Sequence, residues 1–292
     1  MAIKIYTDSC CDLPYTFIED HCEHLRVIGI PVQLNGKEYI DDLGKTLSHN
    51  DFYGFLREQI MPQTAQINAY MFEHEFEKDL ENGHDIIYLG FSSGLSGTYN
   101  SSRIARESLL ERFPDRSIEV IDTLSASVGL AAIIFEVLSF VKEGKDLNYI
   151  VNWTDSNKTK LNHWFGVDSL DFLKNGGRIS NAAAFVGNVL SLKPTLVIDR
   201  EGKLKPHTNV RGRKKSIAFL ASKVKEHMDN PESSVVVIGH GNNLVDALKL
   251  KAAIEETLLV KEIYLTELSM TIASHVGPDM LGVGFIGSER DS

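Results

Sequence analysis

The sequence has few cysteines, and their positions exclude a disulfide framework. Cys10 and Cys11 are adjacent, and Cys22 is the third and last in 292 residues. An odd, crowded set of this kind fits neither paired disulfides nor a zinc-ligand spacing. Long apolar runs are lacking too, because the longest one, around 129–138, is interrupted by Glu136 and is too short to span a bilayer. We therefore expect a cytoplasmic protein without a metal.

An excess of basic residues is also absent. Lys and Arg number 30 against 40 Asp and Glu, which gives a formal net charge of −10 and a pI near 5.5. Nucleic acids and anionic membrane surfaces attract basic proteins, so neither is expected as the main partner, and any membrane contact is expected to be transient. A hydrophobic fraction of 43% over this length allows one large or two ordinary domains, with room for an internal ligand cavity.

Short apolar runs alternate with longer amphipathic stretches along the chain. The strand-like runs are 3–6, 85–90, 118–121 and 234–239, and the helical stretches are 51–59, 69–80, 98–112, 125–143 and 243–257. Such alternation predicts an α/β fold with a mainly parallel sheet flanked by helices.

A polar break at 142–146, followed by a helical stretch at 147–158, indicates a domain boundary near residue 155. We expect an N-terminal α/β domain over 1–155 and a smaller α/β domain over 156–292, with a ligand tunnel between them. Further elements in the second half are strand-like runs at 164–167 and 195–199 and a turn at 201–204.

Two glycine motifs resemble known sites without their context. The run 282–287 fits the dinucleotide-binding glycine pattern, but only 288–292 follow it, and the pattern needs a helix there. Its glycines are expected to serve a terminal strand that packs against neighbouring backbone. The run 94–98 resembles the nucleophile turn of serine hydrolases with its second glycine one residue early. An esterase with Ser96 as nucleophile and His275 as base is therefore the alternative function.

The segment 91–102 is the most informative one, because it follows the strand at 86–90 and precedes a helix beginning near Gly97. Its hydroxyls and free backbone N–H groups are expected to gather at that helix N-terminus, where the helix dipole favours an anion. A simple helix cap would need only one serine. The segment contains Ser92, Ser93, Ser96, Thr98, Gly94 and Gly97.

The kind of anion follows from what this segment lacks. Phosphate sites usually include Lys or Arg, and no basic residue occurs here before Arg103. Neutral hydroxyl donors suit a singly charged carboxylate in an apolar cavity. We therefore expect a carboxylate ligand and no catalytic cofactor.

Seven separated motifs, in order, resemble those of the DegV family and cover the whole chain. They are Thr7-Asp8-Ser9 with Asp12-Leu13-Pro14, the run 91–99, Asp122-Thr123 with Ser127 and Gly129, the run 172–180, Leu192-Lys193-Pro194, the run 211–215 and the run 275–278. The resemblance implies a protein that binds a long-chain fatty acid such as palmitate between two domains and performs no catalysis of its own. It also implies a separate ATP-dependent kinase subunit that phosphorylates the bound carboxylate for phospholipid synthesis.

The resemblance assigns roles to particular residues. Thr64 and Ser96 match the residues whose hydroxyls hold the carboxylate, with Ser93 and Gly97 in the same loop. Arg211 and His275 match polar residues near the carboxylate end that present it to the kinase. Judged without the family, Thr64 is a loop residue or helix cap, Arg211 belongs to a solvated basic cluster, and His275 lies in a turn.

The chain departs from the usual family pattern at three positions. Ala65 and Ile67 stand where Ser and Pro are common, and Asp279 stands where Gly is usual, which places a negative charge near His275. These changes leave the expected ligand class intact and bear on the partner. The expected tunnel lining comprises Phe165, Phe172, Phe185, Val186, Val189, Leu190 and Phe285, and Arg178 caps a turn.

Overall fold

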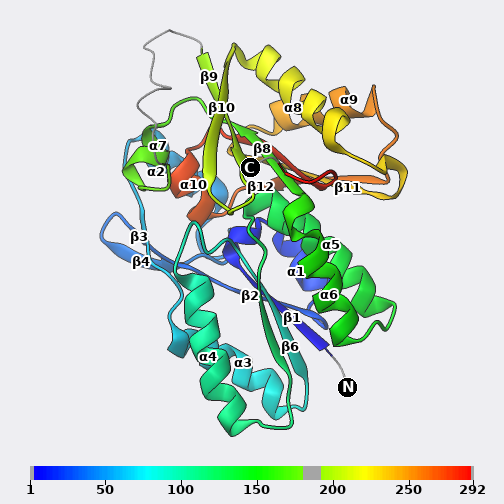
Figure 1. Cartoon of the computed structure of the whole chain (residues 1–292). Coiled ribbons are helices and arrows are strands. Elements are labelled where there is room, and N and C mark those ends of the chain that lie inside the picture. The colour runs from blue at the N-terminus through cyan, green and yellow to red at the C-terminus, as the bar shows by residue number, and fades with distance from the viewer. Residues whose placement is uncertain (1–2, 180–191, 291–292) are drawn as a thin grey trace.

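The fold is α/β, as expected, and contains two main sheets with helices packed on them (Figure 1). A computed structural model describes residues 3–179 and 192–290. The first sheet is wholly parallel, in the order β2-β1-β6-β7. Its strands are β1 (Ile3–Asp8), β2 (Leu25–Ile28), β6 (Asp85–Gly90) and β7 (Ile118–Asp122). The apolar runs at 85–90 and 118–121 are strands because both of their faces are covered by helices.

Three helices of the first half begin after a side chain that caps them. The Asn68 side chain accepts a hydrogen bond from the Met71 N–H (3.0 Å), and the Asp146 side chain accepts one from the Tyr149 N–H (2.7 Å). Such caps satisfy the free donors of the first helical turn. The helices are α1 (Tyr15–Asp20), α2 (His49–Arg57), α3 (Ala69–Glu81), α4 (Thr98–Arg112), α5 (Ser127–Lys142) and α6 (Leu147–Asn157).

The second main sheet is mostly antiparallel, in the order β10-β9-β8-β13-β11-β12, and only β11 and β12 run parallel. The sequence had indicated only parts of it. Its strands are β8 (Leu161–Gly166), β9 (Leu192–Ile198), β10 (Leu204–Arg211), β11 (Val235–His240), β12 (Glu262–Glu267) and β13 (Leu281–Ile286). Its helices are α7 (Asp171–Asn175), α8 (Arg213–His227), α9 (Leu244–Glu255) and α10 (Met270–Val276).

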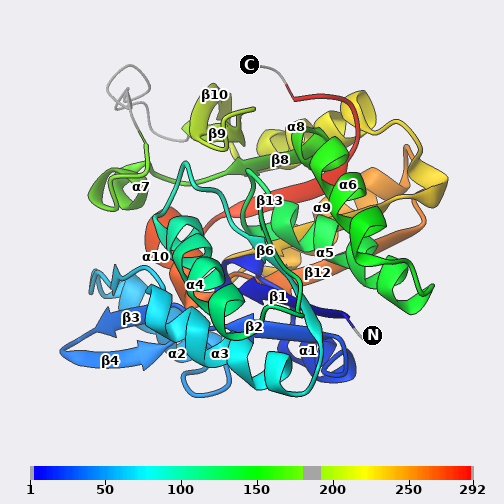
Figure 2. The ribbon, with the colours of Figure 1, turned by 60° about the horizontal axis from the view of Figure 1, so that its bottom comes forward.

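Helix α5 lies between the two main sheets, with α8 and α9 on the far side of the second sheet (Figures 1 and 2). Its first eight residues are all buried, and its apolar side chains share one core with β1, β6 and β11. A helix that is apolar on every side is stable only when it is enclosed on every side. No helix within the described ranges is long and apolar enough to cross a membrane.

A third, small antiparallel sheet joins β3 (Pro31–Leu34), β4 (Lys37–Ile40) and β5 (Gln63–Thr64). The turn between β3 and β4 uses Asn35 and Gly36 at positive φ, the pairing that tight hairpins favour. Strand β5 pairs with β3 so that Thr64 lies opposite Val32. Side chains of this sheet and of α2 share a core with β8, β9 and α10. The first half of the chain thus packs directly on the second, and a division near residue 155 stays a prediction.

The glycine pattern at 282–287 lies mostly in strand β13, as expected. A Cβ at Gly284 would lie 2.3 Å from the Val128 carbonyl oxygen and 2.6 Å from the Gly129 nitrogen. The backbone of β13 at Gly284 therefore approaches the start of α5 closely, and this approach explains the glycine at that position without a nucleotide.

Candidate functional site

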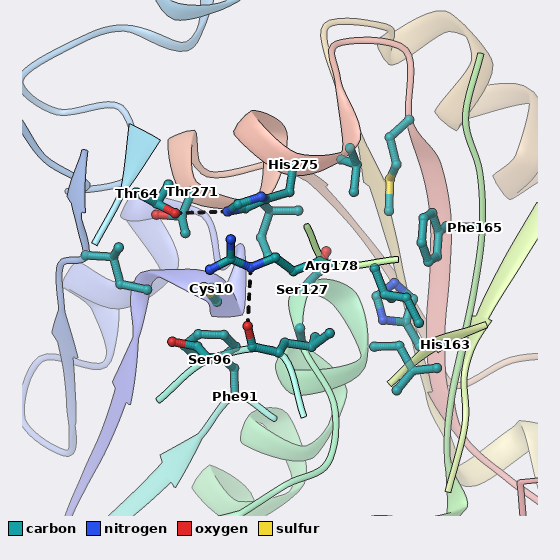
Figure 3. Close-up of a pocket in the computed structure, with 18 of the residues that line it drawn as sticks. Cys10, Thr64, Phe91, Ser96, Ser127, His163, Phe165, Arg178, Thr271 and His275 are labelled. Carbon is teal, nitrogen blue, oxygen red and sulfur yellow. Dashed lines mark hydrogen bonds between the residues drawn. The ribbon is translucent and has the colours of Figure 1, made fainter. Parts of the chain in front are cut away.

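A pocket lies where the two main sheets, the Ser-rich loop before α4 and the helix α10 meet (Figure 3). Most of its wall is apolar, and its polar side chains come from separate elements. The lining residues used below are Cys10, Thr64, Gln66, Phe91, Leu95, Ser96, Ser127, His163, Phe165, Arg178, Ile198, Leu204, Thr271, His275 and Met280. Pockets of this kind, apolar with a few polar groups, are typical of small-molecule sites.

Thr64 and His275 meet at one side of this pocket although 211 positions separate them. The Thr64 Oγ1 atom lies 2.9 Å from His275 Nε2, and either residue can be the donor. The His275 Nδ1 atom is buried and makes no hydrogen bond among the described residues. A Cβ at Gly176 would lie 2.2 Å from this nitrogen, so a glycine there lets the backbone of the α7 end approach the ring.

His275 is neutral near pH 7. Burial, together with the nearby charge of Arg178, lowers the pKa of His275 to about 4. A neutral imidazole carries one N–H donor and one acceptor nitrogen. Together with the Thr64 hydroxyl it offers hydrogen bonds to an oxygen ligand without a fixed positive charge.

Most backbone N–H groups of the Ser-rich loop are hydrogen-bonded, contrary to our expectation that they would be free for a ligand. The N–H groups of Leu95 and Ser96 donate to the Ser92 carbonyl at 3.0 and 3.3 Å, and that of Gly94 donates to the Ser92 Oγ at 3.1 Å. The N–H of Thr98 donates to the Ser96 Oγ at 3.2 Å. The tight turn consumes these donors because it closes on itself before α4 starts. What remains for a ligand is chiefly the Ser96 hydroxyl, which lies 3.0 Å from the Thr98 Oγ1.

The other predicted site residues lie outside the pocket wall. Ser93 is exposed, and its N–H donates to Asp122 at 3.2 Å. Gly97 lies against the side chain of Gln66, whose Oε1 atom would be 2.2 Å from an added Cβ. Arg211 is exposed at the end of β10, where it pairs in register with Leu192. The structure therefore brings together Thr64, Ser96 and His275 and not the other three.

Arg178 is the only cation on the described pocket wall, whereas from the sequence we expected it only to cap a turn. Its Nε donates to the Leu95 carbonyl at 3.4 Å and its Nη1 donates to the Gly176 carbonyl. These bonds hold the guanidinium between the Ser-rich loop and α7, near His275. The pair Gly176-Gly177 that precedes it was the sequence signal for this position, because two glycines before an arginine allow such a close turn.

The arrangement does not assemble a hydrolase dyad within the described residues. The Ser96 hydroxyl contacts Thr98, whereas His275 contacts Thr64. No carboxylate orients the ring either, because the His275 Nδ1 is without a hydrogen bond there. An activated serine needs both contacts. Among residues 3–179 and 192–290, no cluster of three or more His, Cys, Asp and Glu side chains could hold a metal ion.

The expected tunnel lining is correct at one of the three described positions. Phe165 lines the pocket. Phe285 does not, because side chains alternate along β13 and Phe285 points with Val283 into the core under α8 and α9. Phe172 is half-buried and packs over Gly277, outside the pocket. Phe185, Val186, Val189 and Leu190 lie outside the described residues.

Comparisons with known proteins give consistent similarities. The model of the family described as "Uncharacterised protein, DegV family" matches residues 2–288. A DegV domain-containing protein of Clostridium perfringens is 40% identical over 287 residues, 98% of each chain. A DegV lipid-binding protein of Thermotoga maritima is 28% identical and covers 100% of both chains with a TM-score of 0.87. A fatty-acid-binding DegV family protein of Thermus thermophilus is 28% identical, covers 99% of this chain and 100% of its own, and has a TM-score of 0.88.

Proposed function

Because the chain belongs to the DegV family, we propose that it binds one long-chain fatty acid, such as palmitate, in the pocket described above. The observation that carries the proposal is an apolar pocket with hydrogen-bonding groups gathered at one side, from Thr64, Ser96 and His275. The Thermotoga maritima and Thermus thermophilus relatives, described as binding lipid and fatty acid, support the same ligand class.

The head group of the ligand is the carboxylate. Hydroxyls of Thr64 and Ser96 donate to its oxygens, and the neutral His275 supplies a further N–H in one of its tautomers. Arg178 contributes a positive charge at the same side of the pocket. Hydrogen bonds to a charged acceptor are shorter and stronger than those between neutral groups, so a few hydroxyls suffice to orient the acid.

The acyl tail supplies most of the affinity. A chain of about 16 carbons has about 15 methylenes, each contributing about 0.8 kcal/mol when buried, or on the order of 12 kcal/mol in total. Association and ordering offset several kcal/mol of this. The polar contacts therefore determine the orientation of the ligand in the pocket, and burial against the apolar wall supplies most of its binding free energy.

The protein acts as a carrier without bond chemistry of its own and presents the carboxylate to a separate ATP-dependent kinase subunit. This part of the proposal rests on the family motifs. Arg211 is exposed and outside the pocket wall, which suits contact with a partner better than contact with the ligand. Arg211→Ala should therefore leave fatty-acid affinity within about twofold and abolish acyl-phosphate formation, since an exposed charge contributes little to a buried ligand.

The test begins with the protein purified from cells, denatured and analysed by mass spectrometry for a stoichiometric, non-covalent fatty acid of 14 to 18 carbons, about the length assumed above. The delipidated protein is then titrated with a fluorescent fatty acid. Ser96→Ala removes one charge-assisted hydrogen bond of about 1.5–3 kcal/mol and should weaken binding roughly 10- to 150-fold. Thr64→Val keeps the shape and should have a comparable effect. The double variant should lose less than the sum, because both hydroxyls serve one ligand group.

The matched control is Ser222→Ala, an exposed serine on α8 whose hydroxyl donates to the Phe219 carbonyl at 2.7 Å. Its affinity should equal that of the wild type. Unchanged affinity in both Ser96→Ala and Thr64→Val would overturn the proposal that these two hydroxyls bind the carboxylate. A covalent acyl adduct on Ser96, or ester hydrolysis lost in Ser96→Ala, would instead establish the esterase.

A further inference from the structure

His163 is a polar residue in an otherwise apolar part of the pocket wall. It lies on β8, a central strand whose six residues are all buried, and only 3% of it is exposed. Residues two apart on a strand share a face, so His163 and Phe165 both line the pocket, with ring centroids 5.4 Å apart. Their partners across β13 are Gly284 and Gly282, which leave this face uncovered by side chains of that strand.

Both ring nitrogens of His163 are buried and lack a hydrogen bond within the described part of the chain. The Ser125 hydroxyl is in the same condition. The two side chains adjoin, because a Cβ at Gly129 would contact both the Ser125 Oγ (2.2 Å) and the His163 Cβ (3.2 Å). Buried polar groups are normally paired, so the unpaired ring of His163 on the pocket wall indicates a partner that enters the pocket.

The imidazole of His163 is neutral. Burial, together with the charge of Arg290, lowers the pKa of His163 to about 3, and an interaction with the Ala126 backbone opposes this shift. A neutral ring has one donor and one acceptor, which matches a hydroxyl group and does not attract a second carboxylate.

His163 also lies away from the carboxylate side. Figure 3 shows it across the pocket from the Thr64 and His275 pair, with the same apolar space between them. A ligand whose carboxylate is held at Thr64 therefore passes His163 with a part of its chain. Apolar side chains on the pocket wall include Phe91, Leu95, Ile198, Leu204 and Met280.

We propose that His163 makes the pocket select acyl chains that carry a hydrogen-bonding oxygen, such as a hydroxyl or keto group, at a distance from the carboxylate. The inference rests on the proposed function. A plain acyl chain filling the pocket would leave the imidazole unpaired in an apolar setting, whereas a chain hydroxyl can donate to the acceptor nitrogen of the ring or accept from its N–H. Sites built to bond a hydroxyl discriminate strongly against ligands that lack it.

The experiment measures competition of stearic acid and a positional series of hydroxystearic acids against a fluorescent fatty acid on delipidated full-length protein. At least one hydroxy isomer should bind the wild type roughly tenfold or more tightly than stearic acid, the worth of one well-made hydrogen bond. His163→Leu should reduce that ratio to one or reverse it, and His163→Gln, which keeps a donor and an acceptor, should retain a preference. Ser222→Ala, at the exposed serine on α8 outside the pocket, is the control and should keep the wild-type ratio.

The outcomes separate this inference from the proposed function. Binding of stearic acid with equal affinity to every hydroxy isomer would overturn the inference and leave the fatty-acid carrier intact. Failure of the wild type to bind any of these acids would overturn the carrier itself. If circular dichroism shows that His163→Leu does not fold, the affinity ratios of the wild type and of His163→Gln still test the proposed selectivity. If both His163→Gln and His163→Leu keep the wild-type ratio, another residue causes the preference for the hydroxy acid.

Discussion

Asp12 ties together three segments that are far apart in the sequence, and its replacement should be among the most destabilising polar substitutions in the chain. The residue is fully buried and has a positive φ of 49°. Its carboxylate accepts hydrogen bonds from the Ser127 hydroxyl, at the start of α5, and from the Ser269 N–H (2.8 Å), before α10. Its carbonyl accepts one from the Thr266 hydroxyl at the end of β12.

The expected loss in the free energy of unfolding depends on which of these hydrogen bonds each variant keeps. Asp12→Ala leaves two buried donors without an acceptor, at about 1–3 kcal/mol each, and places a Cβ-bearing residue without a polar side chain in the left-handed region. We expect a loss of about 3–5 kcal/mol in the free energy of unfolding. Asp12→Asn tolerates the positive φ, still accepts from the Ser269 N–H and should cost about 1 kcal/mol at pH 7.

The comparison with asparagine should also depend on pH. Burial raises the pKa of Asp12 to about 7, against the opposing hydrogen bonds from Ser127 and Ser269. A raised carboxyl pKa stabilises the fold at low pH, and that contribution is lost as the pH rises through 7. Asparagine does not titrate, so the deficit of Asp12→Asn relative to the wild type should shrink by about 2–3 kcal/mol between pH 5 and pH 8. The raised pKa of Asp8 is common to both proteins and cancels in this difference, whereas the charge of Asp41 contributes to the shift of the Asp12 pKa itself.

Urea unfolding followed by circular dichroism at pH 5, 6, 7 and 8 measures all three proteins. The reasoning is refuted if Asp12→Ala is no less stable than Asp12→Asn at pH 7. It is equally refuted if the deficit of Asp12→Asn stays constant or grows from pH 5 to pH 8, because the buried carboxyl would then titrate as it does in the unfolded chain.

Two further predictions concern single contacts and use thermal unfolding as the measurement. Ser92→Ala removes the hydrogen bond from its hydroxyl to the Gly202 carbonyl (2.7 Å), which joins the Ser-rich loop to the β9–β10 turn, and should cost about 1–2 kcal/mol. Gly241→Ala would place a Cβ 1.9 Å from the Pro278 backbone oxygen and should cost more than about 3 kcal/mol, whereas Gly54→Ala, inside α2 with nothing within 4 Å, should gain about 0.5–1 kcal/mol. Equal effects at the two glycines would contradict the packing argument.

The first half of the fold could be predicted from the sequence because its signals are local. The runs at 85–90 and 118–121 are continuous and apolar, and the helix at 98–112 differs by no residue from α4. The second sheet was indicated only in pieces, because antiparallel pairing depends on partners far along the chain. Strand β8 extends back to Leu161 through Asn162 and His163, two polar residues that made its apolar run look shorter than it is.

The residues of the site also differ in whether the local sequence indicates them. The Ser-rich loop has a local signal, a dense run of small hydroxyl residues after a strand, and Ser96 lies on the pocket wall. Thr64 and His275 have none, since each occurs in an unremarkable stretch and only the fold places them 2.9 Å apart. The family resemblance alone selected them. It also selected Arg211, which lies outside the pocket, whereas Arg178 lies on its wall.

The case of His163 indicates which kind of residue sequence patterns miss. A histidine between Asn162 and Trp164 looks like a half-exposed strand position, where water satisfies the ring. In the fold, β8 is central and covered on both faces, and the same histidine is buried beside a cavity without a hydrogen bond. Its meaning therefore depends on the burial of its strand, which its neighbours β9 and β13 and the helices α5 and α8 provide. A polar residue that a sheet buries without a partner is informative about the ligand because the protein itself leaves that residue unsatisfied.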